Sequence, residues 1–221
     1  MPLKTKENYL KTMYMIDEEK GVISLSELGK RLRVSIPTVN SMAKRLHNDG
    51  FVIYEKYKPV KLTGKGKKEA ALIIRKHRIA EMFLVEKLHF GWEEVHDIAE
   101  EMEHVESEIL FERMNEILGS PTFDPHGSPI PDKNGHIVLD NYPRLSEMQE
   151  GDMVKLMALY DDNSEFLKFL NGKKLKLGAQ ISINKIESFD GSMTVSYKNE
   201  SEVTLSREVC ESLFVKLANE K

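Results

Sequence analysis

The fold is decided near the amino terminus by the stretch Ser24-Leu-Ser-Glu-Leu-Gly-Lys-Arg-Leu-Arg-Val-Ser-Ile-Pro-Thr-Val-Asn40. Its apolar residues recur at helical spacing on both sides of Arg33-Val34, where a tight turn is predicted. Ser26 is the expected N-cap of the first helix, and Ser35 caps the second, with Pro37 in its first turn. Two short helices joined in this way are typical of a helix-turn-helix.

The flanking segments extend this pair into a winged helix-turn-helix. A helical stripe over residues 5–19 precedes it, and the second helix runs to Asp49-Gly50. Short strands are then predicted over 51–54 and 60–62, around a lysine-rich connection.

The second helix of such a pair enters the major groove of DNA, where its first residues meet base edges. Val39, Met42 and Leu46 have the spacing of its buried side. The residues expected to contact DNA are Ser35, Pro37, Thr38, Asn40, Ser41, Lys44 and Arg45, with Lys56 and Lys58 in the wing. The alternative is a winged helix that binds protein.

Downstream segments predict a helical region, a linker and a β-rich domain. Helices are predicted over 64–89, 93–104 and 107–118. Thr63 caps the first of them and Gly66 weakens it. Residues 120–143 hold five of the eight prolines and form the expected linker. Short β-like runs are predicted over 153–159, 180–189, 193–197, 203–205 and 213–217, with one short helix over 164–170.

The predicted fold class is therefore α+β, mostly α, in three domains. These are a winged helix-turn-helix over 1–72, a helical domain with the proline-rich linker over 73–143, and a small β-barrel over 144–221.

The net charge of −4 conceals a strong asymmetry along the chain. Residues 1–80 carry 18 Lys and Arg against 8 Asp and Glu, whereas residues 81–126 carry 2 against 13. The basic part suits a polyanion and the acidic part suits cations. The alternative is a solvated surface with uneven charge.

The composition, 40% hydrophobic and 31% charged, is typical of a soluble globular protein. No apolar run approaches the roughly 20 residues of a membrane helix, and the amino terminus has no apolar signal core. The single cysteine, Cys210, excludes an internal disulfide framework and is expected to be a small buried residue. We therefore expect a cytoplasmic protein with no membrane partner.

Two imidazoles and two carboxylates gather in the acidic segment. His96, Glu100, Glu103 and His104 would share one face of the helix predicted over 93–104. So much negative charge in one stripe is unfavourable unless a cation binds there. Nitrogen and oxygen ligands without thiolate suit Mn²⁺, Fe²⁺, Co²⁺, Ni²⁺ or Zn²⁺. His77 and Glu81 form a second pair, which taken alone is more often a surface hydrogen bond.

Four motifs occur in order along the chain. They are Glu7-Asn-Tyr-Leu-Lys-Thr-Met-Tyr14, Arg75-Lys-His-Arg-Ile-Ala-Glu81, Val95-His-Asp-Ile-Ala-Glu-Glu-Met-Glu-His-Val105 and Asp124-Pro-His-Gly-Ser-Pro-Ile-Pro131. Together they resemble the diphtheria toxin repressor family, which includes iron-dependent regulators and manganese transport regulators. The likeness covers nearly the whole chain and corresponds to the long form of the family, in which the third domain is SH3-like.

The resemblance implies metal ligands residue by residue. The primary site corresponds to Asn8, Glu100, Glu103 and His104, which His77 joins in manganese-type members. The second site corresponds to His77, Glu81 and His96, completed by Asp162 and Glu165 of the third domain or, in related members, by Asp124 and His126 of the linker.

The chain departs from the family pattern at several of these positions. Asn8 stands where relatives have Met or Asp, which weakens that ligand, and Glu100 stands where iron-type members have Cys. Asp124 likewise replaces a Cys of some relatives. Oxygen in place of sulfur favours Mn²⁺, with Fe²⁺ next and other transition metals able to bind in vitro. Lys11 replaces an acid of the short manganese branch, so its closely spaced two-metal arrangement is not expected.

The resemblance implies a metal-dependent repressor of metal-uptake genes that binds a pseudo-palindromic operator as a homodimer, with no small organic substrate. A cation shared between Asn8 and the acidic segment would set the distance between the two reading helices. Apolar faces for the dimer are expected from Ile109, Leu110, Met114, Ile117 and Leu118, and from Phe83 and Leu84, unless these close the domain's own core. The SH3-like domain is expected either to donate ligands or to damp activation by contacting a segment such as 121–131.

Three alternatives stay open at this point. The first is an iron-dependent repressor of the same family. The second is a constitutive DNA-binding protein whose His and Glu residues form only a salt-bridge network. The third is a metallohydrolase that uses the His and Glu cluster, although the chain has no His-Glu-x-x-His motif, nucleophile elbow or phosphate loop, and the expectation is that it is not an enzyme.

Overall fold

The computed structural model describes residues 3–138, 141–198 and 200–218, so the outer ends of the predicted first and third domains lie outside the described residues. The chain divides into two compact units. The first contains residues up to Phe83 together with Asp97–Thr122 and Ile130–Val138, and the second contains Leu84–His96, Phe123–Pro129 and the remainder from residue 139. The predicted division into three domains stays a prediction.

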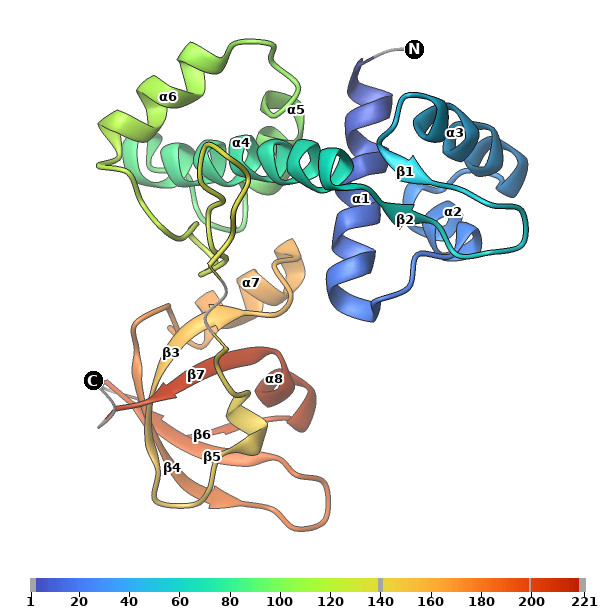
Figure 1. Ribbon diagram of the computed structural model, residues 1–221. Helices are drawn as coiled ribbons and strands as arrows, with labels where there is room; N and C mark the ends of the chain where they lie inside the picture. The colour runs from blue at the N-terminus through green and yellow to red at the C-terminus, as the bar shows by residue number, and fades with distance from the viewer. Residues whose placement is uncertain (1–2, 139–140, 199, 219–221) are drawn as a thin grey trace. The chain divides into compact units, whose positions relative to one another are not determined.

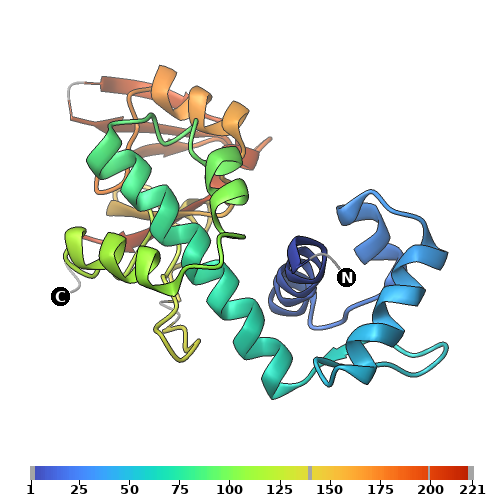
Figure 2. The same cartoon turned by 90° about the horizontal axis from the view of Figure 1, so that it is seen from above.

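The first unit is helical apart from one small hairpin (Figure 1). Its elements are α1 (Leu3–Lys20), α2 (Leu25–Leu32), α3 (Ile36–Asn48), β1 (Val52–Ile53), β2 (Lys61–Leu62), α4 (Gly64–Leu88), α5 (His96–Met102) and α6 (Glu108–Ile117). The last residues of α4 and the first residue of α5 belong to the second unit. Seen from above, α4 leaves the hairpin as a single long helix (Figure 2).

The first three helices and the hairpin share one apolar core, which confirms the predicted winged helix-turn-helix. Leu10, Met13 and Ile16 of α1 are completely buried in it. The predicted inner side of α3 is also correct, because its apolar residues pack into this core while its polar residues face outward. These contacts tie α3 to α1 through the intervening α2.

The N-cap of the first helix of the pair lies two residues before the predicted cap at Ser26. Ser24 is the N-cap, with extended backbone angles, and its hydroxyl accepts a hydrogen bond from the Glu27 backbone N–H (3.1 Å). Ser24 and Glu27 have the spacing of a capping box, a signal that distinguishes Ser24 from Ser26. The predicted turn after α2 is confirmed, since Arg33 adopts a left-handed conformation with φ of 54°.

The wing is joined to α4 by a close backbone contact. Thr63 caps α4 as predicted, and its hydroxyl accepts from the Gly66 N–H (3.1 Å). Gly66 itself lies so near the residue before β1 that an added Cβ would fall 2.0 Å from the carbonyl oxygen of Phe51. The glycine that weakens the helix in isolation is therefore required by packing.

The helices that follow are shorter than predicted. α5 begins at His96 and ends at Met102, and α6 spans Glu108–Ile117. Phe111 and Met114 of α6 pack with Ile79, Ala80 and Ala99 in a small second core of the first unit.

The second unit contains a five-stranded antiparallel sheet of order β6-β5-β4-β3-β7 (Figure 1). Its elements are the 3-10 turn η1 (Leu145–Glu147), β3 (Met153–Leu159), α7 (Ser164–Gly172), β4 (Gln180–Ile186), β5 (Met193–Tyr197), β6 (Glu200–Leu205), α8 (Arg207–Glu211) and β7 (Leu213–Leu217). The small SH3-like sheet domain is thus confirmed. Among the described residues no ladder joins β6 to β7, so the sheet is open.

The short helix α8 was not predicted, because five residues are too few to show a helical period. Its Ser206 cap accepts a hydrogen bond from the Val209 N–H (3.4 Å). α8 also carries Cys210, which is buried as expected, and burial raises the pKa of its thiol to about 12. Among the described helices, none has a stretch long and apolar enough to cross a lipid bilayer.

We expect Gly66→Ala to destabilise the protein by about 1–3 kcal/mol, because the new methyl group would overlap the backbone of the wing. The matched control is Gly64→Ala in the first turn of the same helix, where an added Cβ meets nothing within 4 Å. That change should be neutral or stabilising by up to about 1 kcal/mol. Urea denaturation followed by circular dichroism compares the two, and equal effects would contradict the packing role of Gly66.

Candidate metal centre and DNA-facing helix

The candidate metal centre lies where α1 meets the end of α5 within the first unit. Glu7, Asn8 and Lys11 occupy neighbouring positions on one side of α1. Glu103 and His104 form a turn directly after α5 instead of continuing it, so the predicted four-residue stripe does not lie on one helix. Its first member, His96, is exposed at the start of α5.

The centre of this cluster is the carboxylate of Glu103, whose side chain is 0% exposed. His77 Nδ1 donates to its Oε2 over 2.6 Å. The ammonium group of Lys11 lies 2.7 Å from its Oε1 and 2.5 Å from Oε2 of Glu100. A carboxylate removed from water requires such positive partners, because an isolated buried charge is strongly unfavourable.

His104 is oriented by Glu7, a residue that the sequence interpretation did not include in the site. The Nδ1–H of His104 donates to Oε2 of Glu7 over 2.6 Å, and Glu7 is itself buried. This hydrogen bond leaves the lone pair on Nε2, as is usual for a histidine that binds a metal. Nε2 is enclosed and has no hydrogen-bond partner among the described residues.

His77 is buried between two carboxylates. Its Nδ1 contacts Glu103, and its Nε2 lies 3.1 Å from Oε1 of Glu81, four residues later on α4. Burial disfavours the charged ring, but the hydrogen bonds to Glu103 and Glu81 outweigh it and raise the pKa of His77 to about 9. The pair predicted from the sequence is therefore part of the cluster and not an isolated surface hydrogen bond.

The donor set fits a divalent cation. Oδ1 of Asn8, like Nε2 of His104, is enclosed without a hydrogen-bond partner among the described residues. One donor atom each of His77, Glu100 and Glu103 lie within 4.8 Å of one another. Imidazole nitrogen with carboxylate and amide oxygen suits a first-row transition ion, and these residues would hold it.

The other predicted ligands belong to the second unit, together with His96. The carboxylate of Asp124 accepts hydrogen bonds from the backbone N–H groups of His126 (2.8 Å) and Ser128 (2.9 Å), which stabilise the loop that contains all three residues. The His126 ring contacts the backbone oxygen of Trp92 through Nε2 (2.9 Å), and one of its nitrogens lies within 4.8 Å of a carboxylate oxygen of Asp162. Asp162 and Glu165 are exposed around the start of α7. Because the predicted second site draws on both units, it stays a prediction.

The outer side of α3 carries the residues predicted to face DNA. Ser35, Pro37, Thr38, Ser41, Lys44 and Arg45 are all exposed. Ser35 caps the helix as predicted and its hydroxyl contacts that of Thr38 (2.8 Å). Asn40 is partly buried, and its Oδ1 accepts a hydrogen bond from the hydroxyl of Tyr54 (2.6 Å), a partner that the sequence did not reveal.

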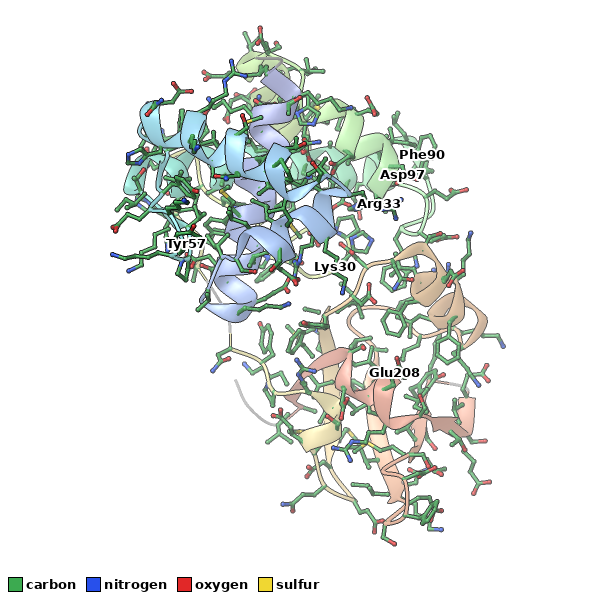
Figure 3. All side chains as sticks on the ribbon, turned by 90° about the vertical axis from the view of Figure 1, so that its right-hand side faces the viewer. Lys30, Arg33, Tyr57, Phe90, Asp97 and Glu208 are labelled. Carbon is green, nitrogen blue, oxygen red and sulfur yellow. The ribbon has the colours of Figure 1, made fainter. Side chains whose placement is uncertain are left out.

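The wing projects basic side chains and one aromatic ring. Tyr57 is 91% exposed and lies at the edge of the first unit in Figure 3. The ammonium group of Lys56 lies 4.7 Å from the centre of this ring, and Lys58 forms an ion pair with Glu55 (2.5 Å). The wing therefore presents an exposed aromatic ring with the ammonium group of Lys56 over it.

Comparison with known proteins covers nearly the whole chain. Residues 1–60 match the iron-dependent repressor N-terminal DNA-binding domain, residues 63–132 the iron-dependent repressor metal-binding and dimerisation domain, and residues 144–217 the FeoA domain. The iron-dependent repressor IdeR of Mycobacterium leprae is 41% identical over 128 residues, 58% of this chain and about half (55%) of that relative.

Two further relatives extend the match. IdeR of Mycobacterium tuberculosis strain H37Rv is 37% identical over 165 residues, which is 70% of each chain. A solved structure described as a manganese-dependent transcriptional repressor in complex with manganese is 28% identical, with a TM-score of 0.85 over 96% of this chain and 99% of that one.

A winged helix, a cluster of potential metal ligands near the amino-terminal end of its first helix and a small sheet domain define a metal-dependent transcriptional repressor. The relatives specify the family further. This chain belongs to the iron-dependent repressor family, which confirms the resemblance found in the sequence and the expectation that the chain is a regulator and not an enzyme.

Replacing His104 with Ala should weaken the binding of Mn²⁺ by at least about tenfold, since even the partners that orient a ligand contribute about 10- to 100-fold. The control is His136→Ala, which removes an exposed imidazole paired with Asp132 in the same unit (3.3 Å). Isothermal titration with MnCl₂ gives both affinities. Equal affinities would remove His104 from the site.

Proposed function

We propose that this protein is a manganese-responsive repressor that binds operator DNA as a homodimer when a divalent metal is bound. The proposal rests on one observation: two separate parts of the first unit supply the side chains of the cluster. Glu7 and Asn8 come from α1 within the winged-helix core, whereas Glu103 and His104 follow α5. A bound cation would attract both sets of donors and so hold α1 against the end of α5.

The DNA-binding part of the proposal is supported by α3. Because α3 shares a core with α1, the orientation of its outer side follows that of α1. In a dimer the two reading helices must match half-sites about one helical turn apart, so fixing α1 favours the state that binds a pseudo-palindromic operator.

The preference for Mn²⁺ is supported by the donors. Glu100 supplies oxygen where iron-type members have sulfur, and oxygen suits Mn²⁺. A relative of this chain is described as a manganese-dependent repressor, while others are described as iron-dependent. Iron is therefore the second candidate metal. The candidate ligands of a second site are His77, Glu81 and His96, completed either by Asp162 and Glu165 or by Asp124 and His126.

The homodimer is supported by α6, although part of its predicted face has another role. Met114 is buried in the small second core of the first unit, and Leu118 and Phe83 pack against that core. Leu84 of α4 is also buried. Ile109, Leu110 and Ile117 remain exposed on α6. We propose that these three residues form the centre of the contact between subunits.

The test of function is binding to an operator selected from randomised duplex DNA in the presence of Mn²⁺. We expect retardation of this operator to require divalent metal, with Mn²⁺, Fe²⁺ and Zn²⁺ compared under anaerobic conditions. Glu103→Ala should abolish the metal-dependent retardation, because the carboxylate at the centre of the cluster is lost.

The control is Glu101→Ala, which removes a carboxylate of α5 that is 76% exposed and forms an ion pair with Lys4 (2.9 Å). This variant should behave as the wild type. Operator binding that is equally strong without metal would favour the constitutive DNA-binding protein instead.

The subunit contact is tested by Ile117→Glu, which places a charge on the exposed face of α6. We expect the dimer dissociation constant to rise by at least about tenfold, since residues at the centre of an interface contribute most of its affinity. Val138→Glu is the control, because Val138 is an apolar residue outside α6 that is at least as exposed as Ile117 (79% against 59%). Sedimentation that shows a wild-type monomer with and without Mn²⁺ would contradict the proposed dimer.

A further inference from the structure

Lys11 makes close ionic contacts with two carboxylates of the candidate metal centre. Its ammonium group lies 2.5 Å from Oε2 of Glu100, 2.7 Å from Oε1 of Glu103 and 2.8 Å from Oε2 of Glu103. These three oxygens belong to two of the carboxylates that the proposed function assigns to the cation. Lysine is a compact point charge with no acceptor, so it competes for the same lone pairs as a metal ion.

The surroundings make this contact stronger than an ion pair at the surface. The Lys11 side chain is 12% exposed, Glu100 33% and Glu103 0%. Attraction between charges increases as water is excluded, whereas exposed pairs contribute little. A second ion pair joins the same two helices and provides the contrast, because Lys4 and Glu101 are 46% and 76% exposed.

Lys11 and Asn8 approach the cluster from the same side. They are three residues apart on α1 and therefore neighbours on the helix surface. Through Lys11, α1 is attached to the end of α5 by the same carboxylates that a cation would use. A divalent ion and an ammonium group on these oxygens together would repel each other at short distance.

We propose that Lys11 is a tethered competitor of the metal: its ammonium group occupies the carboxylates of Glu100 and Glu103 and must leave them before a divalent ion binds. The inference rests on the proposed function and adds a determinant of its sensitivity. The free energy of the lysine contacts is subtracted from that of metal binding, so Lys11 sets the concentration at which the protein responds. In the metal-free state the same contacts stabilise the first unit.

The test measures Mn²⁺ affinity and metal-free stability in Lys11→Met and in Lys4→Met. We expect Lys11→Met to bind Mn²⁺ more tightly by on the order of tenfold, equivalent to about 1.4 kcal/mol, and to melt at a lower temperature without metal. Lys4→Met should change neither property, because its exposed pair lies outside the cluster. Lys11→Gln, which keeps a polar side chain without charge, provides the same comparison if the methionine variant does not fold.

A double-mutant cycle locates the effect. In the Glu103→Gln background, Lys11→Met should tighten Mn²⁺ binding less than it does in the wild type, because one of the two carboxylates for which the cations compete is gone. An undiminished affinity gain in this background, or Lys11→Met affinity equal to or weaker than the wild type, would overturn the proposal while leaving the proposed function intact. A wild-type protein without saturable Mn²⁺ binding would instead remove the proposed function and the competition with it.

Discussion

A carboxylate shut off from water must be neutralised, and the position of Glu103 makes this the constraint on which the first unit depends. An imidazole from α4 and an ammonium group from α1 both reach it. Removing one partner from such a group is expected to destabilise it strongly, because the remaining charge has no water to compensate. The arrangement of α1, α4 and the end of α5 is therefore linked to which cation lies beside this one side chain.

The segment that the sequence presents as a linker contains an ordered part of the second unit. Asp124 accepts two backbone N–H groups of its own loop, and the Leu159 N–H of β3 donates to the carbonyl of His126 (3.0 Å). The rings of Trp92 and His126 stack with their centres 5.9 Å apart. The prolines in this segment have no backbone N–H to donate. The Asp124 carboxylate accepts hydrogen bonds from the N–H groups of His126 and Ser128 and so fixes the conformation of the loop.

Local patterns predicted most of the elements, and tertiary contacts account for what they missed. The buried side of α3, the cap at Ser35 and the strands of the second unit follow from periodicity and turn chemistry. The shortened α5 does not, because its end is set where Glu103 turns inward to meet His77 and Lys11. No local rule identifies these partners.

The candidate site shows the same division. Glu100, Glu103 and His104 could be selected from the sequence because they cluster within five residues and resemble a family motif. Glu7 was missed although a carboxylate one residue before Asn8 was visible, since its partner is 97 positions away. The sequence interpretation of Lys11 was limited to the expectation that two closely spaced metal ions do not bind. Its contacts with Glu100 and Glu103 became visible only in the folded structure.

The hydrogen bond from Tyr54 to Asn40 bears on how the base preference of such a regulator could be redesigned. It joins the residue after β1 to the middle of α3, so the amide of Asn40 is oriented from outside its own helix. Grafting α3 alone from a relative that lacks this asparagine would leave the hydroxyl of Tyr54 without its acceptor. Helix and wing have to be exchanged as one cassette, and evolution of new operators in this lineage would be expected to change both together.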